Sequence, residues 1–267
     1  MRLSRRRFLA LTAASPVALA LNACLGSDDP EVVVLADGQP VTASTATPVP
    51  TATSTPAPLP FTPRATNSDL DPEDLQGFTM PVADACLPSS ERLMPNAPRT
   101  YRNGVHEGVD FYFGDSCVVI DRGTPVLSMY EGVVIRADHD YEELTPGLLA
   151  ELEVRTAERG YSDEETLDVY RGRQVWVDHG NEVITRYCHL ESIAPGVSVG
   201  LEVRAGDHLG GIGESGTPES VTDPGTEIHL HAEVRVGDSF LGEDLPAEEI
   251  RRLYTRLFEA DDGSAES

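Results

Sequence analysis

Short apolar runs in which every second position is polar recur along the chain from about residue 110 to residue 236. They are DFYF, PVLSM, GVVIRA, RQVWVDHG, EVITRYCHL, HLGGIG and IHLHAEVRV, with Gly, Pro, Asp and Asn between them. Successive side chains of a strand point to opposite faces, so these runs predict strands that bury one face against a core. Their close spacing predicts a mainly β domain built from antiparallel strands.

Helical signals replace this alternation between about residues 140 and 171. Thr145 and Pro146 can begin a helix over TPGLLAELEVRTAERG, because a threonine cap and a first-turn proline suit a helix N-terminus. Ser162 with Glu165 predicts a capping-box start for a second helix. We interpret the segment as a helical hairpin inserted between strands.

A last helix is predicted in LPAEEIRRLYTRLFEA near the C-terminus. Ile250, Leu253 and Leu257 recur at helical spacing there, so one apolar face should pack against the sheet. The folded domain is predicted to span residues 77–259. Residues 260–267 are predicted to form a disordered acidic tail.

The N-terminus has the anatomy of an export signal. Residues 1–24 combine a basic start, an apolar stretch and small residues before Cys24. SRRRFLA resembles a twin-arginine signal, and LNAC resembles a bacterial lipobox, in which the cysteine is lipid-modified. A signal that is simply cleaved beside an incidental cysteine is the alternative. Residues 25–76 predict a disordered tether, because positions 39–63 hold seven Pro and seven Thr in 25 residues.

The charge of the chain excludes one class of partner. All 20 cationic residues are Arg, against 45 Asp and Glu, and the formal charge is −25. Nucleic-acid affinity comes largely from cations that neutralise phosphates, so a nucleic-acid partner is not expected. We expect a monomer.

Cysteine usage fits an exported protein, in which thiols tend to pair. Beyond Cys24, the chain has Cys86, Cys117 and Cys188, which allows one disulfide and one free thiol. We favour a Cys86–Cys117 disulfide and a buried Cys188. No CxxC motif is present, so a thiolate zinc ribbon is not expected.

The run EIHLHAEVRV, residues 227–236, carries two histidines on one face of a predicted strand. Because side chains at i and i+2 point to the same side, the imidazoles of His229 and His231 should stand side by side. Such a pair is compatible with two interpretations, either surface or satisfied histidines or a chemical site.

Two further stretches bear on that choice. HEGVDFYF holds His106 and Asp110 four residues apart, at a turn leading into a strand, since Gly108 disfavours a helix interior. TRYCHLESIAPG places His189 on a predicted strand, on the same face as Tyr187. A catalytic zinc needs three N or O ligands and an open position for water. His106, Asp110 and one histidine of the pair would supply them, and the other imidazole would be free for proton transfer.

Together, HEGVD, GTPVLSMYEGVV, VDHGNEVITRYCHL, GESGTP and IHLHAEV resemble the LytM/lysostaphin-type zinc endopeptidases of the M23 family. Enzymes of this family cut peptide crosslinks of bacterial cell walls. The resemblance implies their distorted barrel-sandwich hybrid fold and one Zn²⁺ per chain. It implies His106, Asp110 and His231 as zinc ligands.

The resemblance also implies His189 and His229 as the catalytic histidines. Tyr101 is a candidate hydrogen-bond donor to the oxyanion, with a packed aromatic ring as the alternative. Three features depart from the family pattern: the longer FYFGDSCVVIDR connection with Cys117, the helical hairpin, and Ala232 in place of an aromatic residue. We expect the two longer segments near the rim of the groove, where they affect substrate preference.

Other motifs are expected to be structural. No partner stands at ligand spacing from the remaining histidines, which are His139, His179 and His208. GIGESG, residues 211–216, matches a dinucleotide-binding pattern, but no helix follows it, so we interpret it as a turn.

The expected function is that of a zinc metalloendopeptidase acting on peptidoglycan peptides. The protein would be exported and anchored to the cell membrane through lipidated Cys24. One alternative is a non-catalytic M23-like surface protein that binds the wall or activates another wall hydrolase. A glycan-cleaving enzyme with paired carboxylates is a third, although no carboxylate pair stands out.

Overall fold

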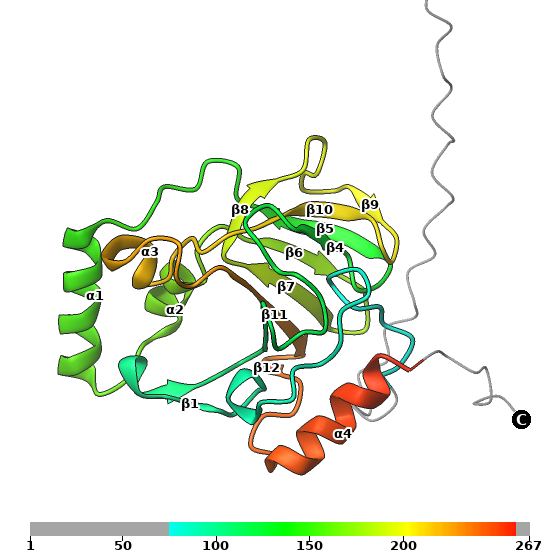
Figure 1. The fold of residues 1–267 in the computed structure, drawn as a ribbon, viewed down its shortest axis with the longest axis horizontal. Coiled ribbons are helices and arrows are strands. Elements are labelled where there is room, and N and C mark those ends of the chain that lie inside the picture. Colours follow the sequence, from blue (N-terminus) through cyan, green and yellow to red (C-terminus); the bar gives the residue numbers. More distant parts are fainter. Residues whose placement is uncertain (1–74, 260–267) are drawn as a thin grey trace, which may run out of the picture. The chain divides into compact units, whose positions relative to one another are not determined.

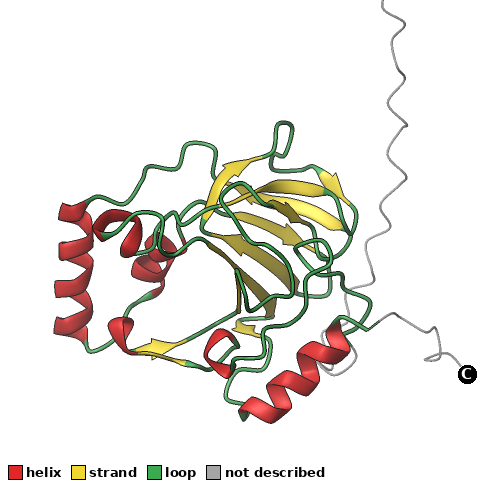
Figure 2. Cartoon of the chain, in the orientation of Figure 1, coloured by secondary structure: helices red, strands yellow, loops and turns green. Residues whose placement is uncertain are grey.

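The computed structural model of the protein describes residues 75–259 (Figure 1). Most of its regular structure is antiparallel strands, with few helices (Figure 2), so the predicted mainly β fold is confirmed. The export signal, Cys24, the tether up to residue 74 and the acidic tail lie outside the described residues.

The strands are β1 Pro98–Arg99, β2 Gly104–Val105, β3 Val109–Tyr112, β4 Pro125–Leu127, β5 Gly132–Ala137, β6 Val175–Asp178, β7 Val183–Cys188, β8 Leu190–Ile193, β9 Glu202–Val203, β10 His208–Ile212, β11 His229–Val236 and β12 Ser239–Phe240. The helices are α1 Pro146–Arg159, α2 Glu164–Arg171, α3 Glu219–Thr222 and α4 Ala247–Leu257, with 3₁₀ turns at Glu91–Leu93 and Thr100–Arg102.

The larger sheet has the strand order β12-β11-β7-β6-β5-β9, and β3 pairs with β11 beside it. A smaller sheet has the order β4-β10-β8, and β1 pairs with β2. Within the part of the chain that the structure describes, none of these sheets closes into a barrel. Strand β11 is central to the site, because it pairs with β7 on one edge and with β3 on the other.

Along β11, alternate side chains belong to the hydrophobic core and to the candidate site. Leu230, Ala232 and Val234 point into the main hydrophobic core, which the apolar residues of the other strands complete. The intervening side chains of His231 and Glu233 lie on the opposite face. Helix α4 buries Ile250, Leu253 and Leu257 in the same core, as the helical spacing predicted.

The two ends of the described segment lie side by side. The amides of Gly77 and Phe78 donate to the carbonyls of Glu259 and Leu257, at 2.8 and 3.0 Å. Leu75 is buried in the main core, so the folded part includes at least two residues that the sequence pattern had assigned to the tether.

The inserted hairpin is present as helices α1 and α2 (Figure 1). Thr145 caps α1 by accepting the amide of Leu148. The predicted cap of α2 is wrong by one residue: Asp163, not Ser162, accepts the Thr166 amide at 3.0 Å. A carboxylate also interacts favourably with the positive end of the helix dipole, whereas the Ser162 hydroxyl pairs with Thr156.

The cysteines of the described residues form one disulfide and leave one free thiol. Cys86 and Cys117 form a disulfide that ties the β3–β4 connection to the segment before β1. Cys188 is a free, buried thiol whose pKa burial raises well above its ordinary value. Within residues 75–259, no helix combines the length and apolar character needed to cross a bilayer.

Candidate metal centre

The register between β3 and β11 brings together residues 121 positions apart. Asp110 lies directly opposite His231, and Tyr112 lies directly opposite His229. Opposed residues of an antiparallel pair have their Cβ atoms about 4.5–5.5 Å apart, so the pairing itself places a carboxylate against an imidazole. The Tyr112 ring stacks on His229 with 4.3 Å between centroids.

His106 joins this pair from the segment that precedes β3. Gly108 lets that segment approach β11, because a Cβ at this position would stand 2.4 Å from the Ala232 carbonyl oxygen and 3.0 Å from the His231 ring. No side chain tolerates such contacts without displacing the backbone. The glycine between His106 and Asp110 is therefore needed for the site to close.

The three predicted ligands converge on one point. His106 Nε2 lies 2.9 Å from Asp110 Oδ1, His231 Nδ1 lies 2.8 Å from the same oxygen, and the two nitrogens are 2.9 Å apart. All three side chains are buried. Among the described residues, they are the group of His, Cys, Asp and Glu side chains with the spacing of a metal site.

Neighbouring groups orient each ligand atom. His106 Nδ1 faces the Met94 carbonyl at 3.0 Å, His231 Nε2 faces Glu233 Oε1 at 3.2 Å, and Arg99 donates to Asp110 Oδ2 at 2.8 Å. In neutral His106, Nδ1 donates to the Met94 carbonyl and the Nε2 lone pair faces Asp110, while His231 lies between the carboxylates of Asp110 and Glu233. A proton on His231, or a cation where the ligand atoms meet, balances these acceptors. The donor set and its outer partners fit zinc, whose histidine ligands donate their second N–H to carbonyls or carboxylates.

The electrostatics of the ligands also favour a cation. Burial lowers the pKa of His106 to about 4. Burial alone would raise the pKa of Asp110, but His106 and the other histidines lower it well below its usual range. Burial likewise would lower the pKa of His231, yet its hydrogen bonds to Asp110 and Glu233 raise it. Two ionised carboxylates, Asp110 and Glu233, therefore flank His231, and this negative charge favours a cation at the ligand atoms.

His189 and His229 stand beside this group. Their ring centroids are 4.6 Å apart, and His229 Nε2 lies 3.7 Å from Asp110 Oδ1. Carbonyls of Ser215 and Glu227 face their Nδ1 atoms at 2.8 and 2.7 Å, so each Nε2 is free to accept a proton. Burial, followed by the neighbouring histidines for His189, lowers both pKa values. Both shifts favour the neutral imidazole, which is the form that can accept a proton.

The predicted placement of His189 on a strand is wrong. The residue has φ of +61° and separates β7 from β8. A continuous strand would direct its side chain to the same side as Tyr187, which is buried in the core. The left-handed backbone at His189 instead directs the ring toward His229 and His231, where a hydrogen bond from its amide to the Arg171 carbonyl at 2.9 Å supports it.

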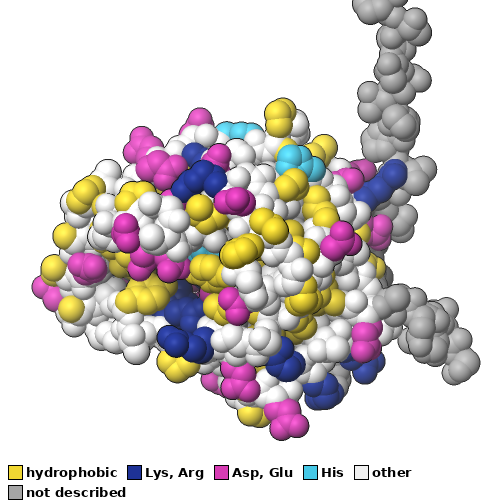
Figure 3. All heavy atoms as spheres, in the orientation of Figure 1, with side chains coloured by type: hydrophobic (Ala, Val, Ile, Leu, Met, Phe, Trp, Pro, Cys, Tyr) yellow, Lys and Arg dark blue, Asp and Glu magenta, His cyan; other side chains and the backbone are white. Residues whose placement is uncertain are grey.

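The cluster opens into a cavity of about 720 Å³. Tyr101 lines the cavity, is 54% exposed and meets Tyr170 edge to face. Its position at the cavity fits an oxyanion donor, and its ring contact fits a packed aromatic residue. The β3–β4 connection contributes Phe113 and Asp115, and the hairpin contributes Glu153 and Tyr170, which places both longer segments at the rim as expected. In Figure 3, dark blue arginine atoms gather at the hollow over β1.

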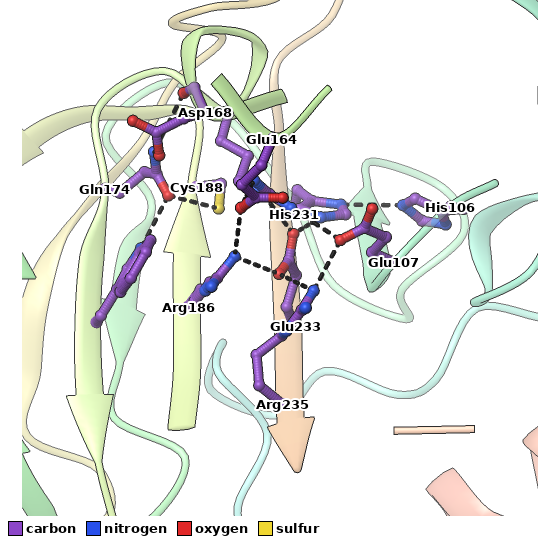
Figure 4. Close-up of polar contacts among 12 residues, drawn as sticks. His106, Glu107, Glu164, Asp168, Gln174, Arg186, Cys188, His231, Glu233 and Arg235 are labelled. Carbon is purple, nitrogen blue, oxygen red and sulfur yellow. Dashed lines mark hydrogen bonds and ion pairs between the residues drawn. The ribbon is translucent and has the colours of Figure 1, made fainter. Parts of the chain in front are cut away.

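Sequence reasoning missed the charged side chains behind the ligands. Figure 4 shows Glu233 between His231 and several arginines, and burial would raise its pKa, but Arg171 and His231 lower it well below its usual range. Glu107 belongs to the same group. One signal was available: Glu233 follows His231 by two positions and so shares its face of the strand. Nothing in the local pattern indicates Arg171.

The remaining histidines lie apart from the centre, as expected. His179 is buried between the Glu131 carbonyl and Thr185, while His139 and His208 bond to backbone carbonyls. The GIGESG stretch begins inside β10, at Gly211 and Ile212, and becomes a turn only after them. The expectation that no helix follows it is wrong, because the short helix α3 begins at Glu219.

The protein-family model described as "Peptidase family M23" matches residues 104–242. No curated protein matches the chain. Among solved structures, a zinc-containing peptidase from Vibrio cholerae matches with a TM-score of 0.40 and 24% identity, over 64% of this chain and 41% of that chain. Csd3 from Helicobacter pylori matches with a TM-score of 0.32 and 19% identity, over 61% of this chain and 32% of that chain.

The catalytic domain of lysostaphin, an antimicrobial peptidase from Staphylococcus simulans, matches with a TM-score of 0.35 and 21% identity, over 58% of this chain and 85% of that domain. The chain thus spans less than half of the first two structures and most of the third.

Proposed function

The chain belongs to peptidase family M23, and from this premise we propose that it is a zinc-dependent endopeptidase that hydrolyses peptide bonds of cell-wall peptidoglycan. The observation that carries the proposal is the convergence of the ligand atoms of His106, Asp110 and His231 on one point, beside two further histidines and an open cavity.

His106, Asp110 and His231 would hold the zinc ion. When bound, the ion lowers the pKa of a coordinated water and polarises a substrate carbonyl. Arg99 and the Met94 carbonyl keep Asp110 and His106 in place for this role. The cavity admits a substrate peptide, and its aromatic and charged walls can orient the chain across the centre.

His189 and His229 would carry the proton. Hydrolysis adds water to the amide carbon, breaks the C–N bond and transfers one proton from the water to the leaving amine. A neutral imidazole accepts that proton at Nε2 and returns it to the amine nitrogen. The carbonyls of Ser215 and Glu227 fix the tautomer that makes this possible. Tyr101 is our candidate donor to the oxyanion from the cavity wall.

We also propose that the protein acts outside the cytoplasm as a membrane-anchored monomer. The export signal, Cys24 and the Pro/Thr-rich tether of the sequence support this, since such a tether holds a domain away from a bilayer. A Cys24→Ser variant should lose membrane association in cell fractionation. If the variant stays in the membrane fraction, the lipid anchor is not at Cys24.

The test of the activity uses purified protein and purified cell-wall sacculi. We expect about one zinc per chain, release of new amino groups, loss of that activity with a chelator and its return with zinc. Release of reducing sugar ends would indicate a glycan-cleaving enzyme instead. A folded protein that cuts nothing but stimulates a separate wall hydrolase would indicate the non-catalytic alternative.

A further inference from the structure

Arg171, the last residue of the inserted helix α2, is 3% exposed and lies against the metal centre. Its guanidinium donates to three glutamates, from Nε to Glu233 Oε1 at 2.7 Å, from Nη1 to Glu164 Oε1 at 2.9 Å and from Nη2 to Glu107 Oε2 at 2.8 Å. One side chain therefore occupies three acceptors with three different nitrogens.

Two of these three glutamates, Glu233 and Glu107, connect Arg171 to a ligand. Glu233 Oε1 also faces His231 Nε2 at 3.2 Å, so the same oxygen contacts both the arginine and the ligand histidine (Figure 4). Glu107 is the residue after His106, and Arg171 holds its carboxylate, so this bond ties the ligand segment to helix α2. Its oxygen also accepts from Arg235 at 2.7 Å.

The backbone of Arg171 reaches a third member of the site. Its carbonyl accepts the amide of His189 at 2.9 Å, at the point where the left-handed conformation turns the His189 ring toward the centre. Arg171 is thus connected to both ligand-bearing segments and to a proposed catalytic histidine, although it belongs to the inserted hairpin.

The charges around Arg171 are balanced. Arg186 and Arg235 lie 3.4 Å from Glu233 Oε2, so three arginines meet the three glutamates of the group. Removing one partner of a buried ion pair leaves the other charge uncompensated, so Arg171 and Glu233, both almost fully buried, depend on each other. Lysine could supply the charge of Arg171, but it lacks the planar arrangement of donors that reaches several carboxylates at once.

We propose that Arg171 is a positioning residue of the metal centre, which makes the inserted hairpin a structural part of the site. This inference rests on the proposed function. Arg171 holds Glu233 behind His231 and Glu107 beside His106, so the two ligands keep the orientation that zinc requires.

The experiment compares full-length Arg171→Lys and Arg171→Met with wild type. Zinc affinity is measured by competition with a chromophoric chelator, and kcat and KM are measured on a wall peptide. We expect about 10- to 100-fold weaker zinc binding, the range typical for loss of an outer-shell partner. At saturating zinc, kcat should fall and KM should change little. Arg171→Met leaves carboxylates unpaired and is expected to be the less stable variant. The zinc affinity and kcat of Arg171→Lys therefore decide whether the inference holds.

Arg136→Lys is the matched control. Arg136 pairs with Asp168 of the same helix α2 at 2.5 Å, and its other contacts are Asp138 and the Trp176 ring, so it touches neither a ligand nor Glu233. We expect it to lower the melting temperature as an ion-pair loss does, with zinc affinity unchanged. If Arg136→Lys weakens zinc binding as much as Arg171→Lys does, the effect is loosening of the helix and the inference is overturned.

Two more outcomes separate this inference from the proposed function. Wild-type zinc affinity and kcat in Arg171→Lys would overturn the inference alone. If wild type binds zinc but cuts no wall peptide, while Arg171→Lys binds zinc more weakly, the positioning role stands and the peptidase proposal fails. If wild type binds no zinc, both fail.

Discussion

The two oxygens of Asp110 have different tasks. Oδ1 faces His106 and His231, whereas Oδ2 is held by Arg99. The four histidines around it also differ: a carbonyl fixes the tautomer of His106, His189 and His229, whereas His231 lies between two carboxylates. Ligand and proton carrier can therefore be told apart by the atom that each ring presents and by its neighbours, although all four side chains are of one type.

This distinction predicts different effects for two kinds of variant. His189→Ala and His229→Ala should each lower kcat by about 10²- to 10⁴-fold, because a general acid–base group contributes about that much. Zinc content, measured by elemental analysis, should stay near one per chain in both variants. His231→Ala should lose the metal together with the activity. Full metal and full activity in His231→Ala would show that the ligand assignment is wrong.

At the scale of elements, the site depends on how β3 pairs with β11. The register opposes Asp110 to His231, and a slip of one residue would turn the carboxylate to the other face. Gly108 is the position where this pairing is tightest, because the Ala232 carbonyl leaves no room for a Cβ.

Gly108→Ala tests the pairing. The added methyl would meet the Ala232 oxygen at 2.4 Å, so β3 must shift away from β11. We expect a loss of about 1–3 kcal/mol in unfolding free energy, as for other overpacked sites, and weaker zinc binding. The control is Gly147→Ala in α1, where nothing lies within 4 Å of the new Cβ. That change should stabilise the protein by about 0.5–1 kcal/mol in urea unfolding, without altering zinc affinity.

At the scale of the whole molecule, stability depends on histidines that are buried without charge. His179 is the case remote from the ligands, packed between the Glu131 carbonyl and Thr185. Burial lowers its pKa to about 4. The unfolded chain takes up a proton near the ordinary value, about 6.5, whereas the folded protein does so only near pH 4. The unfolded state therefore binds more protons between these values, and stability falls as the pH falls through this window.

The contribution of His179 to this loss should be about 3 kcal/mol between pH 6.5 and 4. His179→Gln cannot titrate, so its unfolding free energy should fall less steeply over that range, although it starts lower at pH 7. Urea unfolding of the metal-free proteins at several pH values compares the two slopes. Equal slopes would mean that folding does not shift the pKa of His179.

Local patterns were sufficient for the longer elements but missed the short ones, which are β1, β2, β9, β12 and α3. Period-two alternation predicts the strands, and capping and helical spacing predict α1, α2 and α4, because these signals act within a few residues. The same alternation places His229 and His231 on one face, whereas His106 and Asp110 became candidates through their spacing and through the resemblance to the M23 family. Even the one-residue error at the cap of α2 is local, since Ser162 and Asp163 are adjacent and both are good caps.

Tertiary structure decided what those residues meet. The pairing of Asp110 with His231 joins strands far apart in the chain, and pairing register follows from packing of the whole core. The backbone at His189 leaves the strand conformation because the Arg171 carbonyl and the neighbouring elements hold it there. Arg171 itself is one arginine among many in the sequence. Only the docking of the inserted hairpin makes it a neighbour of both ligand segments, because a contact between distant residues leaves no periodic signal in either of them.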